Sequence, residues 1–239
     1  MKEGRSALAL VIFDCDGVLI DSERIFARAL AEGLAAAGFP ATVEEALSLG
    51  LGLDDAAVSA AVRARFGRPL PEGFFVEMWQ SALETFTIEL RPMPGVIALL
   101  ETLETPCCVA SNSPLEAIRK GLELTGLGRF FGSRVYSAEK VARGKPAPDL
   151  LLLAAREEGA SPPSTLVVED SPRGVEAALA AQMTAVGFCG GSHCGAGHGE
   201  HLLAAGCASV FGTMAELARF LEASNRFSGA GRRRSGSRC

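Results

Sequence analysis

The sequence lacks two features that would point to a membrane or to nucleic acid. Its apolar runs stay far below the roughly 18 residues that a membrane-spanning helix needs. Positive charge is also scarce, because 23 Lys and Arg stand against 28 Asp and Glu, which gives a formal net charge of −5. This balance argues against a general nucleic-acid surface. We therefore expect partners that are neither membranes nor nucleic acids.

Cysteine pairs of the CxxC type are missing, although the chain has seven cysteines. An odd number without paired spacing favours reduced thiols. A secretory signal is not expected either. Residues 1–13 do place Lys2 and Arg5 before an apolar run, but Asp14 and Asp16 end that run and no small-residue cleavage site is present. We therefore expect a cytoplasmic protein.

Two carboxylates follow directly after the first apolar run. Asp14 and Asp16 come after residues 8–13, which we predict to be a buried strand. On a strand both carboxylates share one face, whereas Cys15 points to the other, which argues against Cys15 as a nucleophile. Burying two negative charges is costly unless a metal or a reacting group balances them. The alternative is an exposed acidic turn, because Asp16-Gly17 is also a common turn signal.

Three later segments place polar or charged groups next to apolar runs or rigid turns. They are 107–114, a strand ending in Ser111, Asn112, Ser113 and Pro114; 144–149, with Lys145 between Gly144 and Pro146; and 165–174, a strand ending in Glu169 and Asp170. The first fits an anion site at a strand-to-helix turn, or a plain helix cap. Lys145 is either a functional residue or a solvated lysine on a loop. Glu169 and Asp170 either belong to a functional site or are ordinary acidic caps of the following helix.

Together the four segments resemble the haloacid dehalogenase-like (HAD) hydrolase superfamily, over about residues 7–222. Its pattern is Asp-x-Asp, then Ser or Thr, then Lys, then paired acids, in the order found here. The stretches GKPAPD and EDSPRG, with a helical insertion after the first motif, resemble the β-phosphoglucomutase-like branch of small sugar-phosphate phosphatases. The resemblance implies an α/β fold: a Rossmann-like parallel sheet core with the first strand central, and an inserted helical cap domain.

The distribution of apolar runs agrees with this organisation. Short runs that we predict to be strands alternate with helical stretches, as in a parallel sheet covered on both faces; they are 8–13, 107–111, 134–137, 165–169, 184–188 and 209–211. Between the first two, helical spacing occurs over 24–38, 42–49, 54–66 and 72–88. We expect a core domain of residues 1–21 and 92–223 and a four-helix cap of residues 22–91. Residues 224–239 are rich in Gly, Ser and Arg and are expected to be a disordered basic tail.

The resemblance also implies roles for the motif residues. Asp14 would be the nucleophile that forms an aspartyl-phosphate, and Asp16 the general acid and base. The other expected site residues are Ser111, Asn112 and Lys145 on the phosphoryl group, and Ser22 and Glu23 near the substrate at a hinge. Magnesium, which prefers hard oxygen ligands, would be held by Asp14, Asp16, Glu169 and Asp170.

The expected reaction is hydrolysis of a sugar or sugar-acid phosphate by a monomeric phosphatase. Asp16 favours a phosphate ester, because dehalogenases and phosphonatases of the superfamily lack an acid there. Mutases of the β-phosphoglucomutase type are the first alternative. They carry a histidine where this chain has Phe26 and an arginine in the cap loop that matches Gly50 to Leu53, which has no base. The second alternative is a catalytically silent sugar-phosphate-binding regulator.

Two further groups of residues stay open. Substrate contacts in the cap are sought among Arg63, Arg65, Arg68, Trp79 and Gln80, although each is more often a surface or core residue. The glycine-rich stretch 190–201 holds all three histidines and Cys194. It could bind zinc, but no recognised ligand spacing is met, so a flexible loop beside the active-site mouth is the favoured interpretation.

Overall fold

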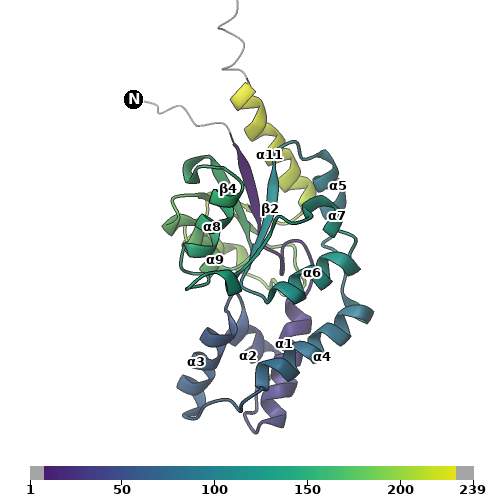
Figure 1. Ribbon diagram of the computed structural model, residues 1–239, viewed down its shortest axis with the longest axis vertical. Coiled ribbons are helices and arrows are strands. Elements are labelled where there is room, and N and C mark those ends of the chain that lie inside the picture. The colour runs from purple at the N-terminus through teal and green to yellow at the C-terminus, as the bar shows by residue number, and fades with distance from the viewer. Residues whose placement is uncertain (1–7, 230–239) are drawn as a thin grey trace, which may run out of the picture.

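The computed structural model describes residues 8–229 and shows two parts (Figure 1). One is a sheet with helices on both faces, and the other is a bundle of helices that lies beyond the carboxyl ends of the strands. The bundle is inserted between the first and second strands, so the chain crosses twice between the parts. This arrangement places the strand ends between the two.

The sheet is parallel throughout. In the order in which they lie side by side, its strands are β3 (Val135–Ser137), β2 (Cys107–Ser111), β1 (Leu10–Phe13), β4 (Thr165–Glu169), β5 (Thr184–Phe188) and β6 (Val210–Phe211). The expected central position of β1 is confirmed. Chain order reverses at β1, and ligands of such sheets bind outside the strand ends at this point.

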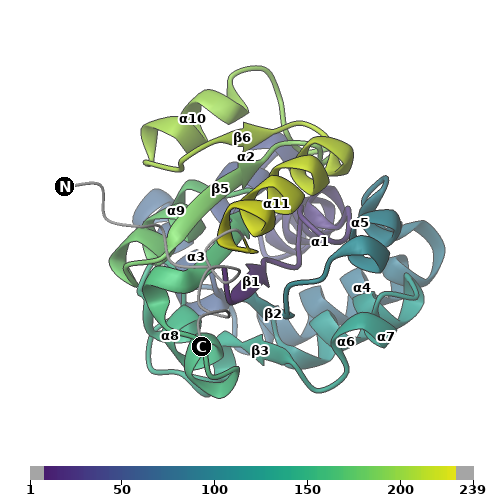
Figure 2. The ribbon, with the colours of Figure 1, turned by 90° about the horizontal axis from the view of Figure 1, so that it is seen from above.

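Both faces of the sheet are covered by helices. The helices of this part are α5 (Val96–Thr102), α6 (Leu115–Leu124), α7 (Gly128–Phe131), α8 (Asp149–Glu157), α9 (Pro172–Ala180), α10 (His198–Ala204) and α11 (Met214–Gly229). Figure 2 shows α8 and α9 on one side of the strands and α5, α7 and α11 on the other. Side chains of a strand alternate between faces. Val11 and Phe13 therefore enter one apolar core, and Leu10 and Ile12 enter the other.

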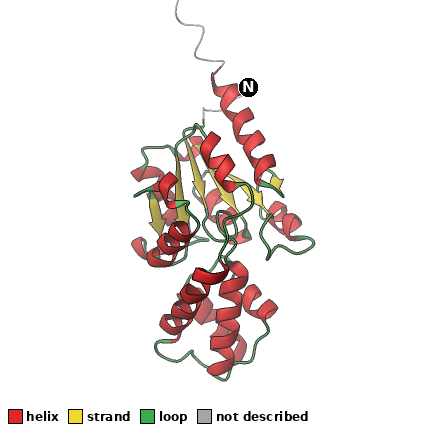
Figure 3. Cartoon of the chain, turned by 90° about the vertical axis from the view of Figure 1, so that its right-hand side faces the viewer, coloured by secondary structure: helices red, strands yellow, loops and turns green. Residues whose placement is uncertain are grey.

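The inserted bundle has an apolar core of its own. Its helices are α1 (Glu23–Ala36), α2 (Val43–Gly50), α3 (Asp55–Phe66) and α4 (Phe74–Glu89). Figure 3 shows these helices as a separate group below the sheet. Buried residues from Ala29 to Ala82 form the bundle core, and Phe26 packs against both this core and one core of the sheet. A capping box of Thr42 and Glu45 fixes the start of α2.

Two details differ from the sequence-based expectations. The tail was expected to begin at residue 224, but α11 continues as a helix to Gly229; residues 230–239 lie outside the described part of the chain. A helix that has formed on apolar residues can extend through polar ones, because propagation costs less than nucleation. Strand β6 contains only two residues of the expected 209–211. Within the described residues no helix is both long and apolar enough to span a membrane.

Candidate active site

The motif residues meet in one pocket between the sheet and the bundle. Asp14 and Asp16 follow β1, Ser111 ends β2, and Glu169 ends β4. Because these strands are neighbours and parallel, their carboxyl ends place the side chains together. The residues that line the pocket from the sheet side are Asp14, Asp16, Ser111, Asn112, Ser113, Lys145, Asp170 and Ser171.

Lys145 joins the first and last motifs through a buried ion pair network. Its Nζ donates to Asp14 Oδ1 at 2.6 Å, to Glu169 Oε1 at 2.5 Å and to the Ala110 carbonyl at 2.7 Å. Only 4% of Lys145 is exposed. Burial alone would lower the pKa of this lysine, but the two carboxylates raise it above its ordinary value. The ammonium is therefore a fixed positive charge beside Asp14.

Burial shifts the pKa values of the carboxyl groups in this network. Burial raises the pKa of Asp14 well above its usual range and Lys145 opposes the rise, while neighbouring carboxylates add to it. The pKa of Glu169 is raised by burial in the same way, again against the effect of Lys145. The single positive charge of Lys145 therefore does not balance the negative charges of the carboxylates around it. A further cation would oppose the rise in these pKa values and favour the charged carboxylates.

Three hydroxyl groups hold Asp16. Ser22 Oγ donates to Asp16 Oδ1 at 2.7 Å, and Ser113 and Ser111 donate to Oδ2 at 2.7 and 3.1 Å. Burial raises the pKa of Asp16, although all three hydroxyls oppose the rise. Ser22 does not line the pocket, so it reaches the site only through Asp16. Ser113 was considered as a helix cap from the sequence, and its contact with Asp16 needs the folded chain.

Asn112 fixes the lysine loop and contacts the bundle. Its Oδ1 accepts from the backbone N–H of Lys145 at 2.8 Å, and its Nδ2 donates to the carbonyls of Lys145 and Gly52 at 3.0 and 3.2 Å. Arg173 adds a second contact from the sheet side, because Nη1 donates to the Leu51 carbonyl at 3.0 Å. The loop that follows α2 is therefore held over the strand ends.

Asp14, Glu169 and Asp170 form a cluster of acids that fits a hard cation. One oxygen of each lies within 4.8 Å of the others, and all three residues are buried. Carboxylate oxygens are the ligands that Mg²⁺ and Ca²⁺ prefer. The chain leaves room for Glu169 through Gly174, where an added Cβ would come within 1.9 Å of the Glu169 carboxyl carbon.

The bundle covers the pocket with apolar and acidic side chains. They are Glu23, Phe26, Ala27, Leu30, Ala46, Leu47, Gly50, Leu51, Gly52, Leu53, Asp55, Val58, Phe75, Met78 and Trp79. Trp79 packs edge-on against Phe26, with ring centroids 4.6 Å apart, and its Nε1 donates to Asp55 at 3.0 Å. Among the described lining residues, Lys145 is the only Lys or Arg.

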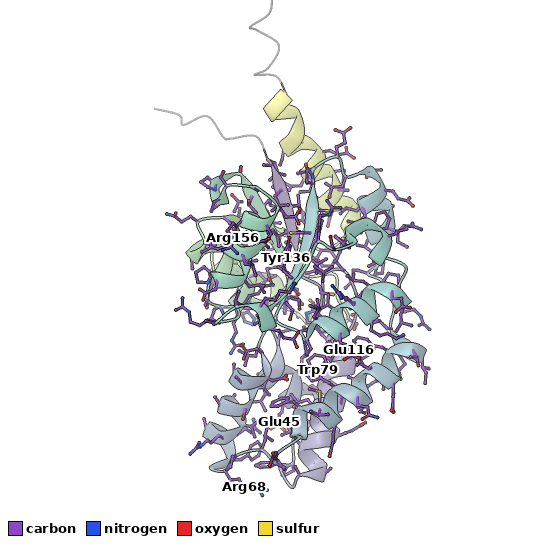
Figure 4. The ribbon with its side chains drawn as sticks, viewed as in Figure 1. Glu45, Arg68, Trp79, Glu116, Tyr136 and Arg156 are labelled. Atoms are coloured by element: carbon purple, nitrogen blue, oxygen red, sulfur yellow. The ribbon has the colours of Figure 1, made fainter. Side chains whose placement is uncertain are left out.

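Most of the cap residues suggested by the sequence do not reach the pocket. Trp79 does, whereas Arg63, Arg65, Arg68 and Gln80 are absent from its lining. Figure 4 shows Trp79 close to the boundary between the two parts and Arg68 at the far end of the bundle. Arg65 pairs with Glu45, and Arg68 stacks on a phenylalanine ring of the bundle. Arg65 and Arg68 therefore make contacts within the bundle and do not contact the pocket.

The arrangement matches a known family. Residues 8–182 fit the profile of the haloacid dehalogenase-like hydrolases, a stretch that covers more than half of the chain. This chain belongs to the haloacid dehalogenase-like hydrolase family. The expected superfamily and its α/β fold are thereby confirmed.

The chain is similar to individual members of this family over most of their length. The chain is 32% identical over 192 residues to hexitol phosphatase B of Escherichia coli, covering 78% of this chain and 85% of that protein. It is 28% identical over 189 residues to 6-phosphogluconate phosphatase of Escherichia coli, covering 79% and 86%. A solved haloacid dehalogenase-like protein from Agrobacterium tumefaciens is 34% identical with a TM-score of 0.78, covering 91% and 99%.

Proposed function

We propose that this chain is a magnesium-dependent phosphatase that hydrolyses a small phosphate monoester through an aspartyl-phosphate on Asp14. The observation that carries the proposal is the convergence of Asp14, Asp16, Lys145 and the acid cluster on one pocket. Family membership and the named phosphatase relatives support the same reaction class. The six cysteines of the described chain are unpaired, which supports a reducing compartment such as the cytoplasm. We also propose a monomer.

In the first step the Asp14 carboxylate attacks phosphorus and the leaving oxygen departs. Lys145 opposes the rise in the pKa of Asp14 and offsets the repulsion between the carboxylate and the phosphate. Mg²⁺, held by Asp14, Glu169, Asp170 and the main-chain carbonyl of Asp16, would supply further positive charge for the transferring group. Ser111, at the end of β2, would turn its hydroxyl from Asp16 Oδ2 to a phosphoryl oxygen when the substrate binds. The expected phosphate contact of Asn112 does not fit its geometry, because its amide hydrogens are donated to the carbonyls of Lys145 and Gly52, so this side chain positions the lysine loop.

Asp16 moves the proton in both steps. Burial raises its pKa, so the carboxyl group can hold a proton for the leaving alkoxide. After the alcohol leaves, the Asp16 carboxylate takes a proton from water, and the hydroxide oxygen attacks phosphorus to release Asp14 and inorganic phosphate. Ser22 and Ser113 hold the Asp16 carboxyl group in place for these transfers.

The lining of the pocket favours an uncharged leaving group. The bundle side of the pocket offers aromatic and aliphatic walls together with Glu23 and Asp55, whereas a second phosphate or a carboxylate needs a cation. We therefore favour a sugar or polyol monophosphate over a sugar-acid phosphate. The same lack of a base disfavours the mutase alternative, in which a bisphosphate must bind. All charged groups of the motifs are present, which disfavours a silent regulator.

The test is phosphate release from a matched panel of monophosphates, with Mg²⁺ and with EDTA. The panel contains hexitol, hexose, nucleoside and sugar-acid monophosphates. We expect Mg²⁺-dependent release that favours uncharged leaving groups and disappears in Asp14→Asn. Asp149→Asn is the matched control, because Asp149 lies outside the pocket and pairs with Arg143. Failure of every substrate with a folded protein would overturn the proposal, and isomerisation of β-glucose 1-phosphate would support the mutase.

A further inference from the structure

A second group of metal-binding side chains lies next to the acid cluster, on and after the loop that follows β5. His193, Cys194 and His198 each place one ligand atom within 4.8 Å of the others. His193 Nε2 is 3.3 Å from Cys194 Sγ, and the two imidazole rings stand at 90° with centroids 5.3 Å apart. Two nitrogens and one sulfur thus converge without any role in the proposed reaction.

The His198 ring is fixed in the manner of a metal ligand. Its Nε2 lies 2.6 Å from the main-chain carbonyl of Asp170, so this nitrogen carries the proton and donates it. With Nε2 occupied by this hydrogen bond, Nδ1 is the ring nitrogen left for a metal. Metal-binding histidines commonly donate their other N–H to a carbonyl or carboxylate in this way, which sets the tautomer and orients the ring.

A fourth donor faces the group from Asp170. Its Oδ2 is buried and has no hydrogen-bond partner of acceptable geometry among the described residues. This oxygen nevertheless lies 2.9 Å from His193 Nε2, whose side chain is fully buried. Gly17 makes the approach possible, because a Cβ there would come within 1.9 Å of Asp170 Oδ2 and 2.7 Å of the His193 ring.

We propose that His193, Cys194 and His198, with Asp170 Oδ2 as the fourth donor, form a binding site for Zn²⁺ or a similar borderline divalent cation. Four donors of this kind match the coordination that Zn²⁺ takes in proteins. The donor set separates this site from the acid cluster, since imidazole and thiolate select transition metals and carboxylates alone suit Mg²⁺.

The cation would also change the state of the Cys194 thiol. Burial, followed by the charge of Asp170, raises the pKa of Cys194 to about 12, so the free group is protonated and unreactive. A divalent cation stabilises the thiolate directly and releases its proton to solvent. Cys194 is half-buried, so the cation can enter from the surface.

Occupation of this site affects the acid cluster through Asp170. The Asp170 carboxylate belongs to both groups, and a cation on Oδ2 withdraws its charge from the neighbouring Mg²⁺ site. Zn²⁺ at this place should therefore raise the Mg²⁺ concentration that the reaction requires. This consequence rests on the proposed phosphatase function, whereas binding of the cation does not.

The first experiment titrates the metal-free full chain with Co²⁺ and records its absorption spectrum. We expect one Co²⁺ per chain, with the near-ultraviolet charge-transfer band of a thiolate ligand and the visible bands of four-coordinate Co²⁺. Zn²⁺ should bleach these bands. Cys194→Ser should remove the thiolate band and weaken binding by at least about 100-fold. The matched control Cys189→Ser should keep the band, because Cys189 is not among the converging ligands.

His198→Asn gives a second variant in case the serine variant fails to fold. It should lower Co²⁺ affinity, whereas His201→Asn, which changes an exposed histidine of the same segment, should not. Co²⁺ binding without a thiolate band, or a band that survives Cys194→Ser, would overturn the site. Inhibition by Zn²⁺, expressed relative to each variant's own activity, should decline in Cys194→Ser. A thiolate band without such inhibition would retain the site and overturn its influence on catalysis.

Discussion

At the scale of single residues, the site depends on a buried network of ion pairs. Lys145 contacts Asp14 and Glu169, which are separated from it by 131 and 24 positions, and the network lies almost fully out of water. Such a network is stable only if each charge keeps its partner, since an unpaired buried charge costs several kcal/mol. The proposed metal ion would supply the positive charge that the carboxylates need in addition to Lys145.

The sequence identified the charged members of the site because their spacing and order form a distinctive pattern. Asp14, Asp16, Lys145, Glu169 and Asp170 were all expected, and the structure brings them together. The hydroxyl groups were harder to assign. Which serine faces Asp16 depends on the turn after β2 and on the start of α1, and neither contact leaves a periodic signal in the chain.

The first prediction at this scale concerns Gly174, whose missing side chain makes room for Glu169. In Gly174→Ala the new Cβ would overlap the Glu169 carboxyl group, which must move away from Asp14 and Asp170. We expect Mg²⁺ affinity to fall roughly tenfold or more, as it does when groups that orient metal ligands are lost. Overpacking should also lower the free energy of unfolding by about 1–3 kcal/mol. Calorimetric Mg²⁺ titration and urea unfolding measure the two effects.

Gly128→Ala is the matched control for this substitution. A Cβ at Gly128 would meet only ordinary contacts at 3.8 Å, and the residue lies in α7, away from the pocket. Its Mg²⁺ affinity should equal that of the unaltered chain. Equal affinity in both alanine variants would show that Glu169 does not depend on Gly174 for its position.

At the scale of elements, strands were easier to predict than the chain end. Buried parallel strands appear as continuous apolar runs, so β1, β2, β4 and β5 were placed within two residues of their observed bounds. The extension of α11 to Gly229 was missed, because local polar composition does not reveal a helix that begins on apolar residues further back. The grouping of His193, Cys194 and His198 was raised as a zinc site but not favoured, since the glycines around them indicated a flexible loop and no recognised ligand spacing was met.

The loop after α2 provides the prediction at this scale. Arg173 donates to the Leu51 carbonyl and so holds the bundle loop against the start of α9. In Arg173→Met this hydrogen bond is lost, and closure of the bundle over the pocket should weaken. A hydrogen bond from a charged group contributes about 1.5–3 kcal/mol, and partial exposure reduces this, so we expect kcat/KM to fall roughly 3- to 10-fold. Steady-state kinetics measure the change.

Arg156→Met controls for the loss of an arginine as such. Arg156 is exposed, pairs with its neighbour Glu157 and lies on the sheet part, far from the bundle in Figure 4. Its variant should keep the original kcat/KM. An Arg173→Met enzyme with unchanged kinetics would mean that the loop stays closed without this contact.

At the scale of the whole molecule, the buried acids should make stability depend on pH and metal together. The folded-state pKa values of Asp14, Asp16 and Glu169 are raised, chiefly by burial. In that case the folded chain binds more protons than the unfolded chain. Stability from these groups is then fully present below their unfolded pKa of about 4 and is lost as the pH rises through the folded values.

We therefore predict that the metal-free protein melts at a lower temperature at about pH 7.5 than at about pH 5.5, with the loss occurring above the unfolded carboxyl pKa. Mg²⁺ competes with these protons, so it should raise the melting temperature more at the higher pH. Differential scanning calorimetry in EDTA and in Mg²⁺ measures both effects. Asp14→Asn should show a smaller pH dependence. A metal-free melting temperature that is flat or rises over this range would contradict the prediction.

The separate apolar cores of the two parts have a consequence for how such a protein can change over generations. The bundle core draws on residues 29–82, whereas the sheet cores hold the strands whose ends carry the chemistry. A substitution of a wall residue that belongs to the bundle core alone, such as Leu30, Val58 or Met78, therefore leaves the packing behind Asp14 and Lys145 intact. The specificity of such an enzyme for one phosphate ester can therefore change to another by single substitutions in the bundle, while each intermediate enzyme keeps its catalytic residues in place.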